Sequence, residues 1–408
     1  MAVMCARHVN RNVLNASFPT CATTKPNRSD ANALPTSTPP KRGSRRMKRA
    51  ATGLASGRMA SPELAQRAVE QALAGLQGQA ASAVLLFLSP DFASNPQPSL
   101  LAASKAAACT QLAGCTATGI LTEQEWIQDA PAAAALALTA PLNIGAAQQA
   151  RQEAILCLAA PNAINTNWLH ANGQRFGGVA GDATGQGAYK IWANGRVQSA
   201  GLTQLQISGG ITRLLISQGL QALSAPVRIN EMRGLELLSL GGLPALEHLA
   251  LAQAEQPNAV DEQALRLAVS LAVEAKDSQS DQGYYPLTLL RKNWRSGSIS
   301  LTQTLEAGQQ VFWAARNPEF TASSLRQQLQ GYVDRHGQPD CVMMFSCAGR
   351  GPQFYGGEDR DWQAIRAALP QTPLLGMYGN GQFAPLAEGN HLLDGTVVLA
   401  LCHGADHV

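Results

Sequence analysis

The sequence predicts an α/β fold made of two related halves, each a largely antiparallel or mixed sheet covered by helices. The chain has 408 residues, which is long for a single hydrophobic core, so two cores are expected. Short apolar runs typical of strands alternate with amphipathic stretches typical of helices, and a similar succession occurs twice. We therefore expect two sheets that stack on each other, with a boundary between the halves near residue 241.

In the first half, the clearest helix start is Ser61-Pro62-Glu63. It combines a hydroxyl cap, a proline at the first helical position and an acidic residue in the first turn. Apolar periodicity predicts a second helix over 99–110, and short apolar runs predict strands over 84–88 and 132–138. The stretch 146–157 has features of both helix and strand, and the sequence does not divide it.

From residue 187 onward, the first half has the composition of a β-rich segment. Asn194-Gly195 lies between two short apolar runs and predicts a type I′ hairpin, because both central positions of that turn need a positive φ. Arg233-Gly234 separates 227–232 from 235–240 and predicts another hairpin. A helix is expected over 243–254.

The second half repeats the succession of strands and helices. Alternation and glycine punctuation predict strands over 287–291, 298–301, 310–314, 342–345 and 396–401. Helical periodicity predicts helices over 318–333 and 358–369. Three tryptophans fall in strand patterns, and core packing is expected for Trp192, Trp294 and Trp313. This pattern favours much antiparallel pairing over a doubly wound parallel sheet.

Residues 1–58 differ in composition from the rest and are expected to form a disordered basic tail. They carry eleven Lys and Arg residues and one acidic residue, Asp30, with almost no apolar periodicity. Three interpretations stay open: an extension ahead of a working start at Met47 or Met59, an organelle transit peptide, and an arm for nucleic acid or an acidic membrane. The net charge of +3 leaves the remainder mildly acidic, so no nucleic-acid partner is expected for the folded part.

Cysteine usage and hydropathy limit the compartment and the cofactors. The eight cysteines include no C-x-x-C pair, so no zinc ribbon or thioredoxin-like motif is expected, and no metal or other cofactor is predicted. Their low density favours reduced thiols and a cytoplasmic location. No apolar run reaches the roughly 18 residues that cross a bilayer, so no membrane span is expected.

Two glycine-rich segments near the end of the chain combine groups that can bind a ligand. The apolar run 341–345 is followed by Ser346-Cys347-Ala348-Gly349-Arg350-Gly351, and the apolar run 373–375 by Gly376-Met377-Tyr378-Gly379-Asn380-Gly381-Gln382. Both are predicted strand ends, where a rigid scaffold presents loop side chains. Glycine lets backbone N–H groups approach a ligand, and a guanidinium can bind a carboxylate through two parallel hydrogen bonds. The second segment is not the dinucleotide fingerprint, and no long helix is predicted after it.

These two segments resemble the C-terminal half of the FIST family of bacterial sensory proteins. Further pieces of the chain follow the family order: Val84–Leu88, Gly114–Gly119, Phe176–Asp182, Ser217-Gln218-Gly219 and Leu393–Leu399. The resemblance covers roughly residues 80 to 402 and implies a FIST N-terminal domain over 59–241 and a FIST C-terminal domain over 242–408. Two positions depart from the family pattern, because Gln382 stands where an acidic residue is usual and Leu220 where a cysteine is usual.

The resemblance implies a cytoplasmic sensory protein that binds a small ligand, such as an amino acid or a related anion or zwitterion, and signals through a partner protein. The candidate ligand-binding residues are Cys347, Gly349, Arg350, Gly351, Gly379, Asn380, Gly381, Gln382, Gly114, Cys115, Thr116 and Asp182. Simpler interpretations stay open beside this one. Arg350 could pair at the surface with Glu358 or Asp359, Asp182 could open an Asx turn, and the thiols could be buried.

Three classes of function follow from these features. A sensor would act through another protein, because the chain shows no kinase, cyclase or methyl-accepting segment. An enzyme would use Cys347 as nucleophile and Arg350 as anion anchor, but no Cys-His-Asn arrangement is visible and His391 is the only histidine nearby in sequence. The third class is a ligand-free scaffold for protein interactions. The sequence favours a sensor without catalytic activity.

Overall fold

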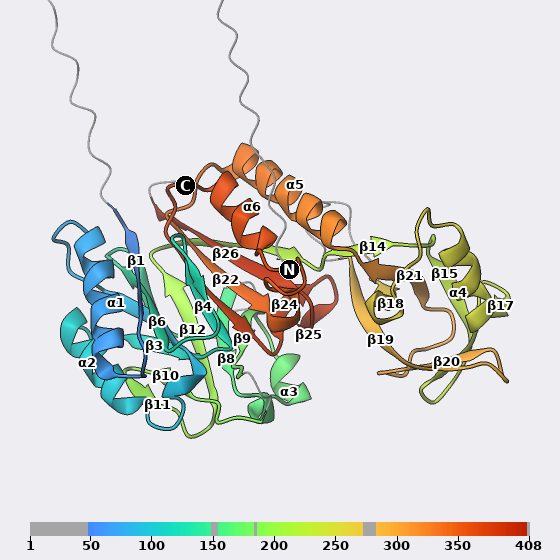
Figure 1. The fold of residues 1–408 in the computed structure, drawn as a ribbon, viewed down its shortest axis with the longest axis horizontal. Coiled ribbons are helices and arrows are strands. Elements are labelled where there is room, and N and C mark those ends of the chain that lie inside the picture. Colours follow the sequence, from blue (N-terminus) through green and yellow to red (C-terminus); the bar gives the residue numbers. More distant parts are fainter. Residues whose placement is uncertain (1–47, 148–153, 183–185, 272–282, 406–408) are drawn as a thin grey trace, which may run out of the picture. The chain divides into compact units, whose positions relative to one another are not determined.

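A computed structural model of the chain describes residues 48–147, 154–182, 186–271 and 283–405. The predicted mixed α/β fold is confirmed, because the described residues form three six-stranded sheets and one eight-stranded sheet with helices packed against them (Figure 1). We name them the N sheet, the C sheet, the middle sheet and the inserted sheet.

The N sheet belongs to the first half and has the strand order β1-β6-β2-β3-β10-β11. Its strands are β1 (Ala50–Ser56), β6 (Ala132–Leu138), β2 (Ala83–Leu88), β3 (Leu112–Thr116), β10 (Ile191–Ala193) and β11 (Arg196–Val197). Helices α1 (Pro62–Gly75) and α2 (Gln97–Ala107) cover one face through a buried cluster of alanine, leucine and valine side chains. The predicted helix start at Ser61 and the two predicted strands are confirmed, although the Ser61 side chain makes no capping hydrogen bond.

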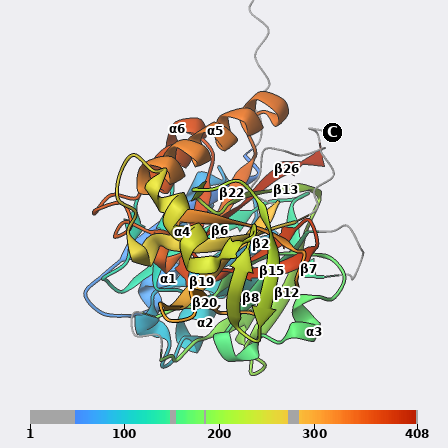
Figure 2. The same cartoon turned by 90° about the vertical axis from the view of Figure 1, so that its right-hand side faces the viewer.

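The C sheet has the strand order β13-β26-β22-β23-β4-β5. Its strands are β13 (Gly210–Ser217), β26 (Val397–Gly404), β22 (Cys341–Cys347), β23 (Leu374–Gly379), β4 (Gly119–Thr122) and β5 (Trp126–Ile127). Helices α5 (Pro318–His336) and α6 (Arg360–Ala368) lie side by side over this sheet (Figure 1 and Figure 2).

The N and C sheets repeat one arrangement of strands, and from here on each half is the part of the chain that builds one of these two repeats. β13 is therefore counted with the second half, although it precedes the boundary expected near residue 241. In the N sheet, β1, β6 and β2 are successively antiparallel and β2 is parallel to β3. In the C sheet, β13, β26, β22 and β23 pair in the same senses. A parallel pair needs a crossover connection, and a helix provides it in each half, α2 in the first and α6 in the second.

The two halves also exchange strands. β4 follows β3 along the chain but pairs with β23 of the second half, and β24 (Gln382–Leu386) follows β23 but pairs with β9 (Gln174–Val179) of the first half. The middle sheet therefore joins both halves, in the order β25-β24-β9-β8-β12-β7. Its other elements are β25 (Gly389–Leu393), β8 (Ala154–Ala159), β12 (Leu202–Ser208), β7 (Asn143–Ala146) and α3 (Thr166–Leu169).

The inserted sheet interrupts the second half between β13 and α5, whereas β1 of the first half leads directly to α1 (Figure 1). Its strand order is β14-β21-β15-β16-β20-β19-β18, and a further pairing of β18 with β21 closes it on itself. Apolar side chains fill its inside, and one face of helix α4 packs against them. Its elements are β14 (Leu220–Ala222), β15 (Val227–Arg233), β16 (Glu236–Leu240), β17 (Leu243–Pro244), α4 (Ala245–Ala254), β18 (Leu265–Ser270), β19 (Tyr284–Asn293), β20 (Ser298–Leu301) and β21 (Gln310–Arg316).

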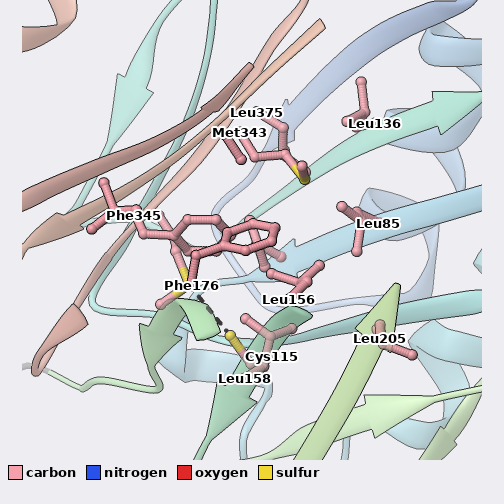
Figure 3. Close-up of a cluster of buried hydrophobic side chains, with 14 of the residues drawn as sticks. Leu85, Cys115, Leu136, Leu156, Leu158, Phe176, Leu205, Met343, Phe345 and Leu375 are labelled. Atoms are coloured by element: carbon pink, nitrogen blue, oxygen red, sulfur yellow. Dashed lines mark hydrogen bonds between the residues drawn. The ribbon is translucent and has the colours of Figure 1, made fainter. Parts of the chain in front are cut away.

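The main core lies where the N, C and middle sheets meet (Figure 3). Phe345 of β22 packs edge-on against Phe87 of β2 and Phe176 of β9, with ring centroids 6.2 and 6.1 Å apart. Such edge-to-face pairs are a favourable aromatic geometry. Because one phenylalanine contacts strands of the other two sheets, the core ties both halves together.

Two sequence expectations need correction and one hairpin is confirmed. Ala50–Ser56 is the mostly buried strand β1, although the region 1–58 was expected to be a tail; residues 1–47 lie outside the described ranges. Trp294 is 79% exposed in the turn after β19, not in the core, whereas the other two tryptophans are buried as expected. Asn194 and Gly195 have φ values of +51° and +69° between β10 and β11, which confirms the hairpin.

The undivided stretch 146–157 begins at the end of β7 and ends inside β8, and its residues 148–153 lie outside the described ranges. Among the helices that the structure describes, none has both the length and the apolar character needed to cross a bilayer.

Candidate functional site

Strand pairing brings turns from both halves to one end of the C and middle sheets. At the end of β22, Cys347 is opposite Gly379 at the end of β23. β23 also pairs with β4, which follows the turn 116–119, and β24 pairs with β9, which leads to Asp182. These segments come from distant parts of the sequence, and together they present polar side chains at one place.

Asp182 and Asn380 are two of the polar side chains at this meeting point. A Cβ atom at Gly181 would lie 3.0 Å from Asn380 Oδ1 and 2.3 Å from Thr118 Oγ1, so glycine is needed for this close approach. The Tyr189 hydroxyl hydrogen-bonds with Asp182 and Asn380, and burial, followed by the charge of Asp182, raises its pKa. The Thr118 hydroxyl is buried without a hydrogen-bond partner among the described residues. We call Thr118, Asp182, Tyr189 and Asn380 the turn cluster.

The glycines of the predicted site mainly permit close packing. A Cβ at Gly379 would lie 2.3 Å from the carbonyl oxygen of Val179, and one at Gly351 would lie 3.1 Å from the Tyr378 ring. Gly381 accepts a hydrogen bond from the Val179 backbone at 2.9 Å, which continues the pairing of the two turns. Gly349 belongs to the short 3₁₀ turn Ala348–Arg350.

Gln382 is fully buried, and both polar atoms of its amide lack a hydrogen-bond partner among the described residues. Its side chain shares a face with Gly178 opposite it, and that face approaches Phe345 and Met377 of the C sheet. A buried amide without partners costs free energy unless a ligand or water satisfies it. Gln382 therefore remains a candidate for contact with a polar ligand group.

The segment Gly114–Thr116 was expected to form a turn, but it lies in strand β3. Cys115 is fully buried, with its sulfur 3.5 Å from Met377 Sδ, and burial raises the pKa of its thiol (Figure 3). A Cβ at Gly114 would lie 1.7 Å from the carbonyl oxygen of Leu86. The Thr116 hydroxyl accepts a hydrogen bond from the Lys190 backbone at 3.1 Å. All three residues therefore have structural roles in this sheet.

Arg350 is buried, with 2% of its surface exposed, and it pairs with Asp361 rather than with Glu358 or Asp359. Its Nε donates to Asp361 Oδ2 at 2.8 Å, and its Nη2 donates to Asp361 Oδ1 at 3.2 Å and to Ser217 Oγ at 2.9 Å. Its Nη1 donates to the carbonyl oxygens of Ser217 and Gly395. A guanidinium has five N–H groups, so all of them are used inside the protein.

The Arg350 network explains why this charge is tolerated in the interior. Burial opposes the charge, but Asp361 holds the pKa of the guanidinium above its ordinary value. The Tyr355 hydroxyl donates a further hydrogen bond to the Asp361 carboxylate, to Oδ1 at 2.8 Å. An anionic ligand would have to displace Asp361 to reach Arg350, so the predicted role of Arg350 as ligand anchor conflicts with its contacts.

Asp359 forms a second buried carboxylate next to this network. It caps α6 by accepting a hydrogen bond from the Trp362 backbone at 2.9 Å, and it accepts another from the Tyr378 hydroxyl. Burial, and then the charge of Asp361, raises the pKa of Asp359 from 3.8 to about 6. Because the unfolded chain releases this proton at a lower pH than the folded protein, ionisation of Asp359 disfavours folding.

We therefore expect the contribution of Asp359 to lower the free energy of unfolding as the pH rises from about 4 to about 6 and to change little above that. Urea unfolding measured across this range should show the fall in the wild type. Asp359→Asn, which cannot ionise, should flatten it. A variant that retains the wild-type pH dependence would show that other groups cause it.

Two arginines that the sequence analysis did not single out lie beside Cys347. Arg266 of β18 is opposite Ala314, and Arg316 of β21 is opposite Leu220 of β14. Opposite residues share a face and side chains alternate along a strand, so both arginines project from the outer face of the inserted sheet. We call Arg266, Arg316, Asp394 and Cys347 the arginine cluster.

The arginine cluster is held by contacts with the segment that precedes β26 in the C sheet. Arg316 Nη2 lies 2.9 Å from Asp394 Oδ2, and a Cβ at Gly395 would lie only 2.0 Å from Arg316 Nη2, so the guanidinium lies flat on this glycine. The next residue, Thr396, accepts a hydrogen bond from the Cys347 backbone at 3.1 Å. Burial and the nearby charge of Arg316 lower the pKa of Arg266, while Asp394 and Cys347 act in the opposite direction.

A cavity of about 280 Å³ opens next to the arginine cluster, at the junction of β21 with α5. Arg316 and Asn317 line it together with Leu223, Ala264 and Ala315. The side-chain amide of Asn317, just after β21, donates to Gln221 Oε1 of β14 at 2.8 Å. The volume is close to the lower end of the range of small-molecule pockets, about 300–1,000 Å³.

The described contacts of His391 do not place its imidazole beside the Cys347 thiol, where a general base would have to lie. This histidine lies on β25, with its ring centroid 4.9 Å from that of Tyr285, and burial followed by the charge of His170 lowers its pKa. Across the described ranges, no three His, Cys, Asp or Glu side chains gather in a way that could hold a metal ion.

Comparison with known proteins identifies two family domains in this chain. The family model of the FIST N domain matches residues 82–243, and that of the FIST C domain matches residues 244–385. Uncharacterised proteins of Mycobacterium tuberculosis are 26% identical over 230 residues, which is 55% of this chain and 60% of the relative. One of Mycobacterium bovis is 26% identical over 231 residues, 55% of this chain and 59% of the relative. The match thus spans about three fifths of these relatives.

Proposed function

The chain belongs to the FIST family, and from that premise we propose that it is a sensory protein that binds a small anionic or zwitterionic ligand. FIST domains are generally associated with sensory roles in signal transduction. The ligand class extends to amino acids and related molecules. The signal passes to a partner protein, and the cell compartment is the cytoplasm, which the free thiols at all six described cysteines favour.

The observation that carries this proposal is the convergence of turns from both halves. Asn380 and Tyr189 can donate hydrogen bonds to a carboxylate, and Asp182 can accept them from an amine. Gly181 allows the turns to approach closely, and the Thr118 hydroxyl is buried with a spare hydrogen-bonding capacity. A zwitterion that contacts residues of both halves would link the two halves, so its binding could alter how they pack on each other.

Binding is favoured over catalysis by the contacts of the two residues that an enzyme would use. Arg350 is committed to Asp361 and Ser217, so it is not available as the anion anchor of Cys347 chemistry. The His391 ring contacts Tyr285, and none of its described contacts places it at the Cys347 thiol as a base. The enzyme and the ligand-free scaffold remain the alternatives that an experiment must separate.

A calorimetric and thermal-shift screen of amino acids, carboxylates and nucleotides tests the proposal. We expect at least one amino acid or carboxylate to bind, and Asp182→Asn or Asn380→Ala to weaken it about tenfold, as for the loss of one hydrogen bond to a charged group. The matched control is Asp334→Asn on the exposed surface of α5. Equal affinity in all variants would move the site elsewhere, and absence of any ligand would favour the scaffold. A turnover lost only in Cys347→Ser would favour the enzyme.

A further inference from the structure

The arginine cluster carries more positive charge than the protein neutralises within it. Arg266 is 8% exposed and the Arg316 side chain 15%, yet Asp394 is the one carboxylate of the cluster, and its side chain is 52% exposed. Arg266, which is buried, and Arg316, which is half-buried, carry two positive charges against one carboxylate, so the net charge of the cluster is +1. Buried charges normally need partners, so the cluster lacks about one negative charge.

Unused hydrogen-bond donors accompany this excess charge. Arg266 Nη1 donates to the carbonyl oxygens of Gln263 and Leu265, both at 2.8 Å, but its Nε is buried without a hydrogen-bond partner among the described residues. Arg316 Nε and Nη2 are likewise buried without one. The Arg316–Asp394 contact is short, but it lacks the geometry of a hydrogen bond, so Asp394 neutralises the charge without satisfying the donors.

The surroundings of the cluster strengthen any attraction to an anion. On the same face of the inserted sheet, Leu220, Ala268 and Ala314 form a small apolar cluster. Apolar walls lower the local dielectric, and charge-assisted hydrogen bonds gain strength there. An oxyanion with two or three acceptor oxygens matches donors that project from two guanidinium groups.

The cluster also lies where the inserted sheet is connected to the C sheet. One connection runs from Ser217 to Leu220 and the other from Arg316 to Pro318. Arg350 donates to Ser217 at the first connection and to the carbonyl of Gly395, on which the Arg316 guanidinium lies. Arg350 therefore acts as a positioning residue, which holds the Gly395 surface against the inserted sheet.

We infer that Arg266 and Arg316 bind an oxyanion group, a carboxylate or a phosphate, and that this group clamps the inserted sheet to the end of the C sheet. The inference deepens the proposed function, on which it rests for the identity of the whole ligand, because it assigns the acidic group of that ligand to the arginine cluster. Binding would then change the coupling between the inserted sheet and the rest of the fold, which a partner protein can detect.

The test titrates the full chain with acetate and with inorganic phosphate against chloride at constant ionic strength, following the unfolding midpoint. We expect saturable stabilisation by at least one of them, and the two arms tell whether carboxylate or phosphate is preferred. Arg316→Gln should weaken the anion at least tenfold. Arg291→Gln, at a 70% exposed arginine of β19, should leave the affinity unchanged.

A variant that should bind the anion more tightly distinguishes a change at the site from a folding defect, which would only weaken binding. Asp394→Asn removes the competing carboxylate and raises the net charge of the cluster, so the anion should bind more tightly than in the wild type. Hydrogen exchange of β14 and β21 should slow when the anion saturates the wild type. Stabilisation that Arg316→Gln and Asp394→Asn leave unchanged would overturn the inference.

The two proposals fail in different ways. Asp182→Asn should weaken an organic ligand but leave the response to phosphate or acetate intact, because Asp182 belongs to the turn cluster. Anion binding that depends on Arg316 while no organic ligand is found would support the anion site and remove support from the sensor. An organic carboxylate that binds equally well to Arg316→Gln would support the sensor and overturn the anion site.

Discussion

Replacing Arg350 with glutamine is expected to lower the free energy of unfolding by about 3–5 kcal/mol, as for other buried ion pairs from which one partner is removed. The substitution leaves the Asp361 carboxylate, which is fully buried, with the Tyr355 hydroxyl as its remaining side-chain donor among the described residues. It also removes the donors to Ser217 and Gly395, which tie β13 to the start of β26. Urea unfolding of wild type and variant measures the difference.

The control for Arg350→Gln is an arginine in an ion pair that is mostly exposed to solvent. Arg233 lies 3.4 Å from Glu231, and the two side chains are 80% and 57% exposed, so Arg233→Gln should cost less than about 1 kcal/mol. Removing both buried charges, with Arg350→Met and Asp361→Asn together, should recover part of the loss. If Arg350→Gln costs no more than the control, the network is not the buried structural element that its contacts indicate.

The Arg350 motif shows where sequence reasoning succeeded and where it stopped. The sequence predicted the strand itself, because apolar runs and glycines are local signals, but it ended the strand at Phe345, whereas β22 continues through Cys347. It could not supply the partners of Arg350, because Ser217 lies 133 positions away along the chain and is reached only through the pairing of β13 with β26. An arginine between two glycines is compatible with either a ligand or a buried carboxylate.

The secondary structure was largely predictable, whereas the assignment of strands to sheets was not. The Asn194-Gly195 hairpin and the helix at Ser61 depend on local conformational preferences. The exchange of β4 and β24 between the halves depends on long-range pairing, and an individual strand carries no signal for its partner. The same limit applies to the closure of the inserted sheet through β18 and β21.

The arginine cluster was missed for a related reason. Arg266 interrupts the apolar strand Leu265–Ser270, and Arg316 ends the strand Gln310–Arg316. A charged residue on the outward face of a strand is normally solvated, so each arginine alone indicates an exposed surface. Only the register places both on one face, and only the fold buries that face against Gly395.

Strand β1 was assigned to the tail because its sequence lacks the residues that normally mark strands. Ala50–Ser56 contains three alanines, a glycine and no β-branched aliphatic residue, so its β propensity is low. Small side chains are needed here for packing: a Cβ at Gly53 would lie 2.0 Å from the carbonyl oxygen of Ala68 in α1. In this strand the Thr52 hydroxyl donates a hydrogen bond to the Glu123 carboxylate. The same carboxylate accepts a hydrogen bond from the Leu374 backbone at 3.0 Å.

Removal of β1 is therefore expected to destabilise the protein, in contrast to the expectation for a tail. A chain that starts at Met59 loses all seven residues that pair with β6, exposes the face of α1 that packs on Gly53, and leaves Glu123 without Thr52. A chain that starts at Met47 keeps them and is the matched control. We expect the free energy of unfolding of the Met59 chain to be lower than that of the Met47 chain by about 3 kcal/mol or more, roughly the contribution of two buried aliphatic side chains. Urea unfolding of the two chains measures this difference, and equal stabilities would mean that β6 does not need β1 at the edge of the N sheet.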